Sequence, residues 1–599
     1  MKWNRIFHPY LLTTFILLFI YKQNVYQLSF VKILIPLIVS LLFILIIHIF
    51  LKGVIKNGNK AAIITSIFGL LFLNYGRIFE TVRRPPHVEP VFLKVFVLLT
   101  LFLVLASIYF FFIKNKLKKK TSNIIITGFL IMLTIMLLFR NRLVYLIIDG
   151  IREIQVALIY RNNAFLMTIV IVFILIFFWV VKAKAKFDSL NHYLNILSVV
   201  LVIMVLAQIG IYFMFNNGID QNPDDILPRS FNKGLIQREP SEFPDIYYII
   251  LDGYAGEKTL LDVFKYDNSN FISSLEARGF YVSNESRSNY LTTFLSIPSS
   301  LNFNYLNFLE DNPGKESLDR SIPYHLLEFN EVAKNLKSIG YQYIFFTSWV
   351  DITRDSKFAD IIYNTLRVSE FSSVFFRSTA LRAFAPNDAY LTTVHTLSKL
   401  KEVPNLSEKP KFVFAHIVSP HPPFIFDREG NEKSNTAYNP RGDQWVDKEG
   451  YVDQIVFLNK KVLEIVDILM NRSNKPPVII VQADHGSETV QGWLKDPTKA
   501  RFDERSYILN AYYLPEGGRE IIYNTITPVN TFRIIFNYYF SQAYELLDDK
   551  VYFSNYLITP YKFELMFENG EYVASAFKED FANGSLSNGQ FFERNFNID

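Results

Sequence analysis

The stretch DIYYIILDGY (Asp245–Tyr254) is a short apolar run of β-branched and aromatic residues that ends in Asp-Gly. Such a run predicts a buried strand whose carboxyl end delivers the carboxylate of Asp252. Four similar runs follow along the chain, at 341–348, 411–419, 477–486 and 508–515. The second half of the chain is therefore expected to contain a sheet of buried strands.

Helical patterns lie between these runs, at about 257–278, 325–339 and 450–472. Strands that alternate with helices indicate an α/β domain in which helices cover both faces of a mostly parallel sheet. Open sheets of this kind bind their ligands beyond the carboxyl ends of the strands. We therefore expect the functional side chains at that edge.

Metal-binding side chains lie near the ends of three predicted strands: Asp252, His416 with His421, and Asp484 with His485. Taken singly, an aspartate at a strand end is commonly a cap, and a lone histidine is more often structural. Together with a hydroxyl they would form one compact site of oxygen and nitrogen ligands. Such a site suits Zn²⁺, Mn²⁺ or Mg²⁺, and the spacing does not choose among them. A threonine hydroxyl bound there would be a nucleophile at neutral pH.

The composition excludes some kinds of chemistry. The chain has 599 residues, half of them hydrophobic, and no cysteine. Its length predicts more than one domain, and the lack of cysteine excludes disulfides, thiolate metal sites and cysteine catalysis. The net charge is +5, and the lysines of the first half cluster in short loops between apolar runs. They indicate membrane topology, so no nucleic-acid partner is expected.

Residues 1–215 predict a transmembrane domain of about seven helices, because a helix needs roughly 20 apolar residues to cross the hydrocarbon. The apolar runs are 9–21, 29–51, 61–79, 91–113, 123–139, 164–182 and 193–215. Three lysine-rich loops are predicted to be cytoplasmic: 52–60, 114–120 and 182–186. The chain after Phe215 is then outside. The apolar stretch 143–160 carries three charged residues and is expected at the membrane interface. This half is either an anchor or a platform that presents a lipid.

The rest of the chain divides into three parts. Residues 216–244 are rich in Asn, Asp and Pro, lack helical periodicity and predict a linker. Residues 245–543 are the predicted catalytic domain. Residues 544–599 form a C-terminal extension of unknown role, with a hairpin turn predicted at Asn569-Gly570.

Four motifs follow one another in the order IILDGY, NYLTTFLSIPSSLN, FAHIVSPHPPF and VIIVQADHGSE. This order resembles the sulfatase-like branch of the alkaline phosphatase superfamily, over about residues 245–540. With the multi-span N-terminal half, it looks most like lipoteichoic acid synthases and phosphoethanolamine transferases. The resemblance implies a transferase integral to the bacterial inner membrane, with an extracytoplasmic catalytic domain. It would move a phospholipid head group, such as phosphoglycerol or phosphoethanolamine, to a surface glycan or lipid through a covalent phospho-threonine.

The resemblance also implies the site residues. One divalent ion (Mn²⁺, Zn²⁺ or Mg²⁺) would be held by Asp252, Thr293, Asp484 and His485. A second ion near His421 is left open. The substrate-binding residues would be His421, His416, Trp349 and Arg354.

The transferases of this branch use an unmodified threonine at the start of a helix, where free N–H groups favour a phosphorylated anion. Pro298 fits the first turn of such a helix, which places the nucleophile just before it. The family's pattern selects Thr293. Thr292 would then be a neighbour that orients it, and Ser296 is the third candidate.

Some positions depart from the family. Lipoteichoic acid synthases carry a glutamate where this chain has Asp252, and a Trp-x-Arg that grips the phosphate. The matching stretch reads SWVDITR, with Asp351 in place of the arginine, so Arg354 is the candidate substitute. Sulfatases make their nucleophile in Cys/Ser-x-Pro-x-Arg, and Ser300 stands where that arginine is required. These departures put the acceptor and head group in doubt and weaken the sulfatase interpretation.

Two other functions remain open. A membrane-bound hydrolase of the same superfamily, acting on sulfuric esters or phosphodiesters, would use the same residues. A non-catalytic surface protein would have no physical reason to keep mutually repelling carboxylates together, so this alternative is disfavoured.

Overall fold

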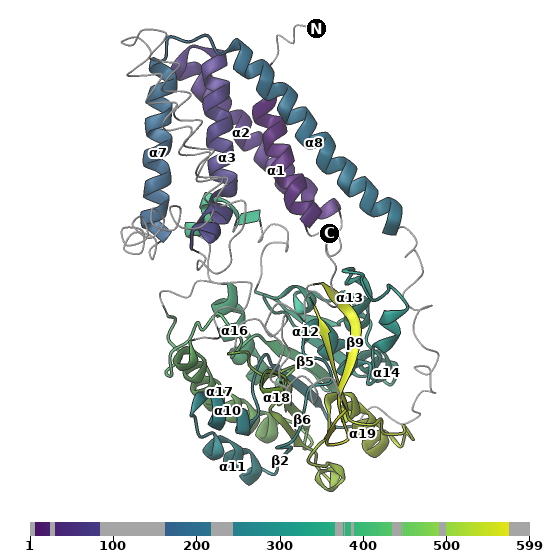
Figure 1. Cartoon of the computed structure of the whole chain (residues 1–599). Helices are drawn as coiled ribbons and strands as arrows, with labels where there is room; N and C mark the ends of the chain where they lie inside the picture. Colours follow the sequence, from purple (N-terminus) through teal and green to yellow (C-terminus); the bar gives the residue numbers. More distant parts are fainter. Residues whose placement is uncertain are drawn as a thin grey trace, which may run out of the picture. The chain divides into compact units, whose positions relative to one another are not determined.

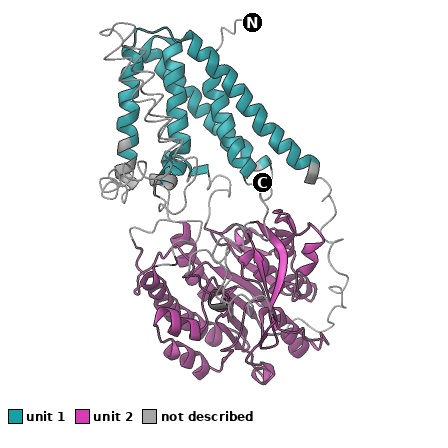
Figure 2. Cartoon of the chain, in the orientation of Figure 1, with its two compact units in different colours: residues 1–214, 371–385 teal, residues 215–370, 386–599 magenta. Residues whose placement is uncertain are grey.

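The computed structural model describes residues 6–23, 30–83, 162–216, 243–365, 378–384, 388–433, 447–489, 499–556 and 558–573, with Val25, Phe375, Phe376 and Trp445. The chain divides into two compact units, coloured separately in Figure 2. Unit 1 comprises Met1–Met214 with Phe371–Ala385, and unit 2 comprises Phe215–Glu370 with Pro386–Asp599.

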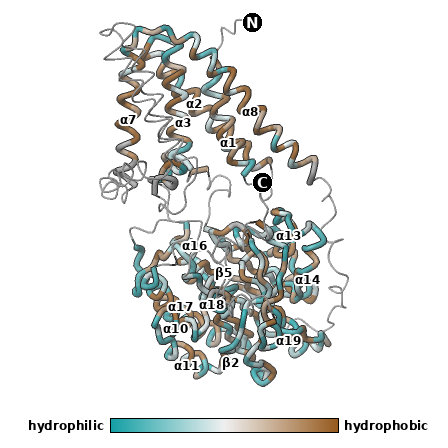
Figure 3. The backbone as a smooth tube through the Cα atoms, in the orientation of Figure 1, coloured by the Kyte–Doolittle hydropathy of each residue, from teal (hydrophilic) through white to brown (hydrophobic). Residues whose placement is uncertain are grey.

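Unit 1 consists, in its described part, of long helices with largely apolar side chains (Figures 1 and 3). They are α1 (His8–Gln23), α2 (Val31–Ile55), α3 (Gly58–Arg83), α7 (Asn162–Lys182) and α8 (Asp188–Asn216). Three stretches among the described residues are long and apolar enough to cross a membrane: Ile33–Ile55, Gly58–Phe79 and Asp188–Met214.

These three stretches overlap the predicted spans 29–51, 61–79 and 193–215. The predicted spans 91–113 and 123–139, the interfacial stretch 143–160 and the loop 114–120 lie outside the described residues. The number of spans therefore stays a prediction.

Unit 2 contains a seven-stranded sheet with the strand order β2-β7-β6-β1-β5-β3-β4. The strands are β1 (Ile246–Leu251), β2 (Tyr281–Val282), β3 (Gln342–Phe346), β4 (Ile361–Tyr363), β5 (Lys411–Ile417), β6 (Val478–Gln482) and β7 (Asn510–Tyr513). The run from β6 to β4 is parallel throughout, and β7 is antiparallel to both of its neighbours. The predicted α/β fold with a mostly parallel sheet is confirmed.

Helices cover both faces of this sheet, and alternate residues of the central strand β1 face the two layers. Tyr247, Ile249 and Leu251 join one apolar cluster, whereas Ile246, Tyr248 and Ile250 join the other. The first cluster contains α10 (Glu257–Phe264), α11 (Ser269–Ala277), α16 (Asp388–Lys399) and α17 (Lys448–Arg472). The second contains α12 (Thr293–Leu301), α13 (Ser321–Glu328), α14 (Glu331–Ser338) and α19 (Pro528–Phe540). The other described helices of unit 2 are α18 (Lys499–Ser506), η5 (Asn307–Glu310), η6 (Asp351–Thr353), η8 (Leu400–Asn405) and η10 (Gly518–Ile521), whereas η7 (Ala380–Phe384) belongs to unit 1.

Two of the predicted helices are each divided in two. The stretch 257–278 breaks after Phe264, because Lys265 adopts a left-handed conformation with φ 56°. The stretch 325–339 breaks where Asn330 caps α14, its side chain accepting a hydrogen bond from the Ala333 N–H. In both places a local backbone signal ends a helix that the apolar periodicity would have continued.

The C-terminal part adds a small antiparallel sheet of β8 (Lys550–Asn555), β9 (Thr559–Glu568) and β10 (Glu571–Tyr572). Its hairpin turn lies at Asn569 and Gly570, both with positive φ, as predicted. The β8 strand also contacts the threonine-bearing loop, because the Tyr552 N–H donates to the Asn289 carbonyl at 2.9 Å.

Candidate active site and metal centre

Three adjacent parallel strands bring the predicted metal-binding residues to one edge of the sheet. Asp252 follows β1, His416 lies near the end of β5, and Asp484 follows β6. Since β1 pairs with both β5 and β6, their carboxyl ends meet. All three side chains are buried, and one ligand atom from each lies within 4.8 Å of the other two.

The ligand atoms of these three side chains are suited to binding a cation. Asp252 Oδ1, His416 Nε2 and Asp484 Oδ2 are buried and have no hydrogen-bond partner among the described residues. Asp484 Oδ1, in contrast, accepts from the N–H groups of Gly253 and His485. Unpartnered buried polar atoms are costly, and three that face one another have the donor chemistry of a divalent-metal site. The residues present therefore fit a divalent ion.

His485 and Thr293 adjoin this cluster. His485 Nε2 lies 3.5 Å from Asp252 Oδ1, 3.4 Å from Asp484 Oδ2 and 3.3 Å from Thr293 Oγ1. Its other ring nitrogen lies 3.0 Å from the Gly486 carbonyl, so Nδ1 carries the proton and the Nε2 lone pair points toward the cluster. The four residues predicted to share an ion thus lie together.

His416 was predicted to contact substrate, yet its Nε2 belongs to the same group of potential ligand atoms. Its Nδ1 lies 2.6 Å from Thr353 Oγ1, whose hydroxyl lies 2.7 Å from Ser348 Oγ. When Nδ1–H donates to Thr353, the ring is held with Nε2 available as a ligand.

Thr293 is the first residue of α12, and Thr292 caps it in an extended conformation with φ −143° and ψ 141°. The prediction that Pro298 lies in the first turn is wrong, because the helix begins five residues earlier. An interior proline removes one backbone hydrogen bond from this short helix, which still forms around it. Ser296 Oγ is buried and donates to the Asp484 carbonyl at 2.6 Å, so it braces the site.

The threonine loop is fixed by Asn289. Its Oδ1 accepts from the Val529 N–H at 2.8 Å, and its Nδ2 donates to the Lys550 carbonyl at 2.9 Å. Ser288 Oγ donates to the Asp484 carbonyl, which ties the loop to the strand end that carries the carboxylate. The position of Thr293 is therefore set by three segments distant in sequence.

Comparison with known proteins connects one segment of the chain with a family. Residues 244–532 match the family model described as Sulfatase. This segment is therefore sulfatase-like. None of the curated proteins compared with the chain matches it.

Several solved structures are similar to the chain. The C-terminal periplasmic domain of EptC from Escherichia coli, in complex with Zn, is 12% identical; the match covers 56% of this chain and 96% of that one, with a TM-score of 0.38. The integral membrane lipooligosaccharide phosphoethanolamine transferase A from Neisseria meningitidis is 14% identical. The match covers 61% of this chain and 73% of that one, with a TM-score of 0.31. The putative sulfatase yidJ from Bacteroides fragilis is 11% identical. The match covers 54% of this chain and 84% of that one, with a TM-score of 0.33.

The electrostatics of the sulfatase-like domain follow from burying two carboxylates side by side. Burial and the charge of Asp252 raise the pKa of Asp484 to about 7. Burial also acts to raise the pKa of Asp252, but His421, His416 and His485 outweigh it and lower that pKa well below its usual range. Burial and Arg505 hold the pKa of His485 well below its ordinary value. The two carboxylates thus behave as a pair that resists carrying two negative charges.

Arg505 is a site residue that the sequence interpretation missed. It lies on α18, is almost wholly buried, and its Nε donates to the Leu291 carbonyl at 3.0 Å. Its Nη2 lies 3.0 Å from His485 Nε2 and donates to the lone pair that a bound ion would take in its place. Gly486 permits this close approach, because a Cβ there would lie 2.3 Å from the Glu504 carbonyl oxygen. The charged stretch KARFDERS follows no strand end, so only its place in the fold reveals the role.

A second arginine holds α18 in place. Arg287 is buried, and its Nη2 donates to Asp503 at 2.8 Å and to the Tyr572 hydroxyl at 3.0 Å. Its guanidinium also lies 3.7 Å from the centre of the Tyr507 ring. The C-terminal hairpin is thereby joined to the helix that carries Arg505.

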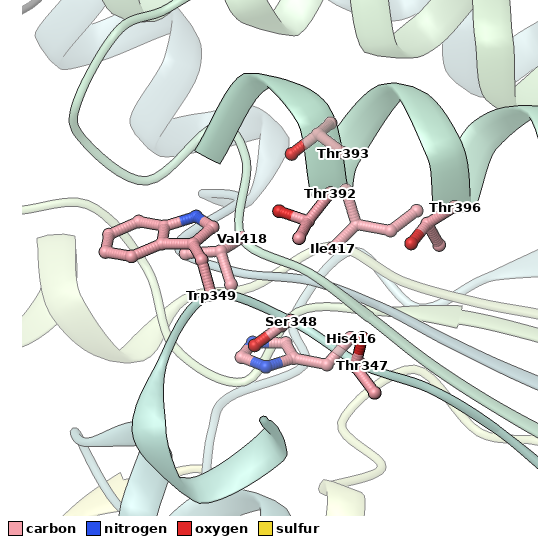
Figure 4. Close-up of a pocket in the computed structure, with 9 residues that line it drawn as sticks. All are labelled: Thr347, Ser348, Trp349, Thr392, Thr393, Thr396, His416, Ile417 and Val418. Carbon is pink, nitrogen blue, oxygen red and sulfur yellow. The ribbon is translucent and has the colours of Figure 1, made fainter. Parts of the chain in front are cut away.

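The other predicted substrate-binding residues differ in how they contact the cluster. The His421 N–H donates to the Asp252 carbonyl at 2.9 Å, and its ring centre lies 6.2 Å from that of His485. Trp349 lies with His416 in the wall of a narrow cavity that has no room for a water molecule (Figure 4). The cavity is lined by Thr347, Ser348, Trp349, Thr392, Thr393, Thr396, His416, Ile417 and Val418. Arg354 Nη1 lies 3.4 Å from the Trp349 carbonyl, so this contact of the guanidinium is with the backbone.

Proposed function

We propose that the chain is a metal-dependent transferase that moves a phospholipid head group to a cell-surface glycan or lipid through a phosphorylated Thr293. One observation carries the proposal. The Thr293 hydroxyl stands at the N-terminus of a helix, 3.3 Å from His485 Nε2, beside the unpartnered ligand atoms of Asp252, His416 and Asp484. This combines a nucleophile, an anion-binding helix end and a metal-type ligand set.

The reaction has two balanced steps. Thr293 Oγ loses its proton and bonds to phosphorus, while the bond from phosphorus to the diacylglycerol oxygen breaks and that oxygen leaves with a proton. An acceptor hydroxyl then loses its proton and bonds to phosphorus, and Thr293 Oγ leaves and is reprotonated. A bound divalent ion supplies Lewis-acid stabilisation of the developing negative charge.

The chain's own residues have distinct parts in this scheme. Asp252, Asp484, His485 and His416 hold the ion. The first N–H groups of α12 face the phosphoryl oxygens attached to Thr293. Arg505, with its guanidinium beside His485 Nε2, supplies a fixed positive charge for the same oxygens, and His421 contacts the substrate from the adjoining turn.

The membrane half supports a lipid donor. Its described part includes three stretches long and apolar enough to span a bilayer. In this scheme residues 245–543 are the extracytoplasmic catalytic domain of a multi-pass protein of the bacterial inner membrane. Residues 216–244 are its linker, and strand β8 of the C-terminal extension 544–599 holds the threonine loop.

A hydrolase of the same superfamily is the second candidate, because the family match is to the sulfatases. A sulfatase would need a modified residue at Ser296, whose hydroxyl is buried and donates to the Asp484 carbonyl. A phosphodiesterase would differ only in that water replaces the acceptor in the second step. The phospholipid experiment below distinguishes these cases.

The test incubates the purified full-length protein with labelled phosphatidylglycerol or phosphatidylethanolamine and Mn²⁺, Zn²⁺ or Mg²⁺, followed by peptide mass spectrometry. We expect a head-group adduct on Thr293 that Thr293→Ala abolishes. Thr292→Ala is the matched control and should keep the adduct. An adduct or a formylglycine at Ser296 would overturn the transferase in favour of a sulfatase. Release of free head group without any acceptor product, when a glycan or lipid acceptor is also present, would indicate a phosphodiesterase.

A further inference from the structure

One segment of the sulfatase-like half belongs structurally to the membrane half. Phe371–Ala385 groups with Met1–Met214 in unit 1, although the chain on either side of it belongs to unit 2 (Figure 2). Its described part is Phe375, Phe376 and 378–384, and this part is called the docking segment below. The chain therefore leaves the catalytic domain, reaches the membrane helices and returns.

The docking segment makes specific apolar contacts with the helices. Phe375 is buried in a cluster that includes Leu17 of α1, Leu73 of α3 and Val205 of α8. Ala380 packs against a second cluster formed by Tyr75 and Phe79 of α3. The following turn, η7, contacts both α3 and α7.

A cation–π contact accompanies this apolar packing. The Arg382 guanidinium lies 5.1 Å from the centre of the Phe79 ring. The stretch FSSVFFRSTALRAFA (371–385) has four phenylalanines, two arginines and no acidic residue. An apolar and cationic composition suits a segment at the surface of a bilayer, where anionic head groups attract positive charge.

The contacts are at the ends of the helices that the lysine pattern places outside. Phe79 lies toward the C-terminal end of α3, away from Lys56 and Lys60 at its start. Ile209, which belongs to the same cluster as Phe375, likewise lies toward the C-terminal end of α8, whereas the lysines at 182–186 precede that helix. The positive-inside rule makes these lysines cytoplasmic, so the docking segment meets the outer ends.

In sequence, the docking segment lies between elements that carry residues of the candidate site. It follows β4, the edge strand next to β3, which leads into Trp349. It precedes α16, which begins at Asp388 and whose threonines line the cavity that His416 also lines (Figure 4).

We propose that the docking segment is a second attachment of the catalytic domain to the membrane helices, and that it serves donors that remain in the bilayer. This proposal rests on the proposed transferase function for its substrate class. A domain held at two points in the chain samples less volume, so a donor confined to the same membrane is present at a higher effective concentration. A water-soluble diester gains nothing from the attachment.

The test exploits two adjacent phenylalanines with different environments. Phe375 is 8% exposed within the helix cluster, whereas Phe376 is 40% exposed. Phe375→Asp places a charge in the docked face, and Phe376→Asp places the same charge on the outer one. Each full-length variant is assayed with labelled phospholipid in proteoliposomes and with bis(p-nitrophenyl) phosphate in solution.

For Phe375→Asp, we expect transfer from the bilayer donor to fall ~10-fold or more, while turnover of the soluble diester stays within about twofold. Phe376→Asp should leave both rates within about twofold. Equal losses on both substrates would mean that the segment only supports folding. An unchanged bilayer rate for Phe375→Asp would also overturn the proposal.

A cross-link measures docking without reference to activity. The chain has no cysteine, so Phe79→Cys with Ala380→Cys creates a single thiol pair. This pair should join efficiently with a short bis-thiosulfonate in membranes, whereas Phe79→Cys with the outward-facing Leu381→Cys should not. Failure of the first pair overturns the docking. If the wild type forms no adduct and turns over neither substrate, the transferase function fails instead, and the cross-link still decides whether the segment docks.

Discussion

Replacing Asp484 with asparagine tests whether the two buried carboxylates repel each other unless a cation lies between them. Asp484 Oδ1 accepts from the N–H groups of Gly253 and His485, and an asparagine carbonyl oxygen can keep both bonds. Oδ2 has no hydrogen-bond partner among the described residues, and it lies in the group that includes Asp252. Asp484→Asn places a neutral N–H donor there, so it removes the repulsion with almost no change in shape.

The expected gain follows from the pKa shift. Burial and the charge of Asp252 raise the pKa of Asp484 from 3.8 to about 7 in the metal-free protein. At 1.36 kcal/mol per unit, the ionised carboxylate costs ~4 kcal/mol of folding stability. The pKa of Asp484 is higher in the folded protein than in the unfolded chain, so protonation of Asp484 favours the folded state. This stabilisation is fully present below pH 3.8 and is lost as the pH rises to about 7.

The assay is thermal unfolding of the full-length protein in detergent with a chelator, followed by tryptophan fluorescence. At pH 8 the midpoint of Asp484→Asn should exceed that of the wild type by roughly 5–10 °C, and the difference should shrink toward pH 4. Added Mn²⁺ or Zn²⁺ should stabilise the wild type in proportion to the logarithm of its concentration, and should stabilise the variant far less.

The control substitution is expected to lower the stability of the protein rather than raise it. Asp453 pairs with Arg428 and Lys433 outside the site, and these contacts lower its pKa. Asp453→Asn should therefore lose up to about 1 kcal/mol at pH 8. If Asp484→Asn is less stable than the wild type without metal at pH 8, or if metal stabilises both equally, the shared cation site is refuted.

Three further substitutions test the surroundings of the cluster. Thr353→Val removes the hydroxyl next to His416 Nδ1 and should weaken metal affinity roughly 10–100-fold by isothermal titration, with unchanged affinity contradicting its orienting role. Arg505→Gln should lower turnover roughly 100-fold while metal affinity stays within a few fold, and retained turnover would remove the arginine from the mechanism. Gly486→Ala places a Cβ 2.3 Å from the Glu504 carbonyl oxygen and should cost roughly 1–3 kcal/mol in thermal unfolding, where no loss would show that α18 can retreat.

The sheet and most of the candidate site were predictable because their signals are local. Apolar runs of strand length marked β1, β5 and β6, and Asp252 and Asp484 followed two of them directly. Parallel strands end at a common edge, so sequence position was enough to predict that these carboxylates meet. The close approach of Thr293 to His485 required the motif order, since no local pattern links the two.

The remaining features depend on packing that a linear pattern does not record. Arg505 reaches the site only because α18 approaches within contact of the Gly486 turn. The start of α12 was misplaced because proline preference for the first turn was given more weight than the extended backbone at Thr292. The place of His416 depended on which way its side chain faces from β5, and a strand buried on both faces shows no polar alternation to decide this.

The bonds to Asn289 have a consequence for biosynthesis. The carbonyl that its Nδ2 contacts lies 261 residues later in the chain, and the N–H of Tyr552 follows shortly after. Synthesis proceeds from the N-terminus, so a nascent chain carries Thr293 and its metal-type side chains long before β8 arrives to fix the loop. The candidate site would therefore acquire its geometry only after β8 has been synthesised.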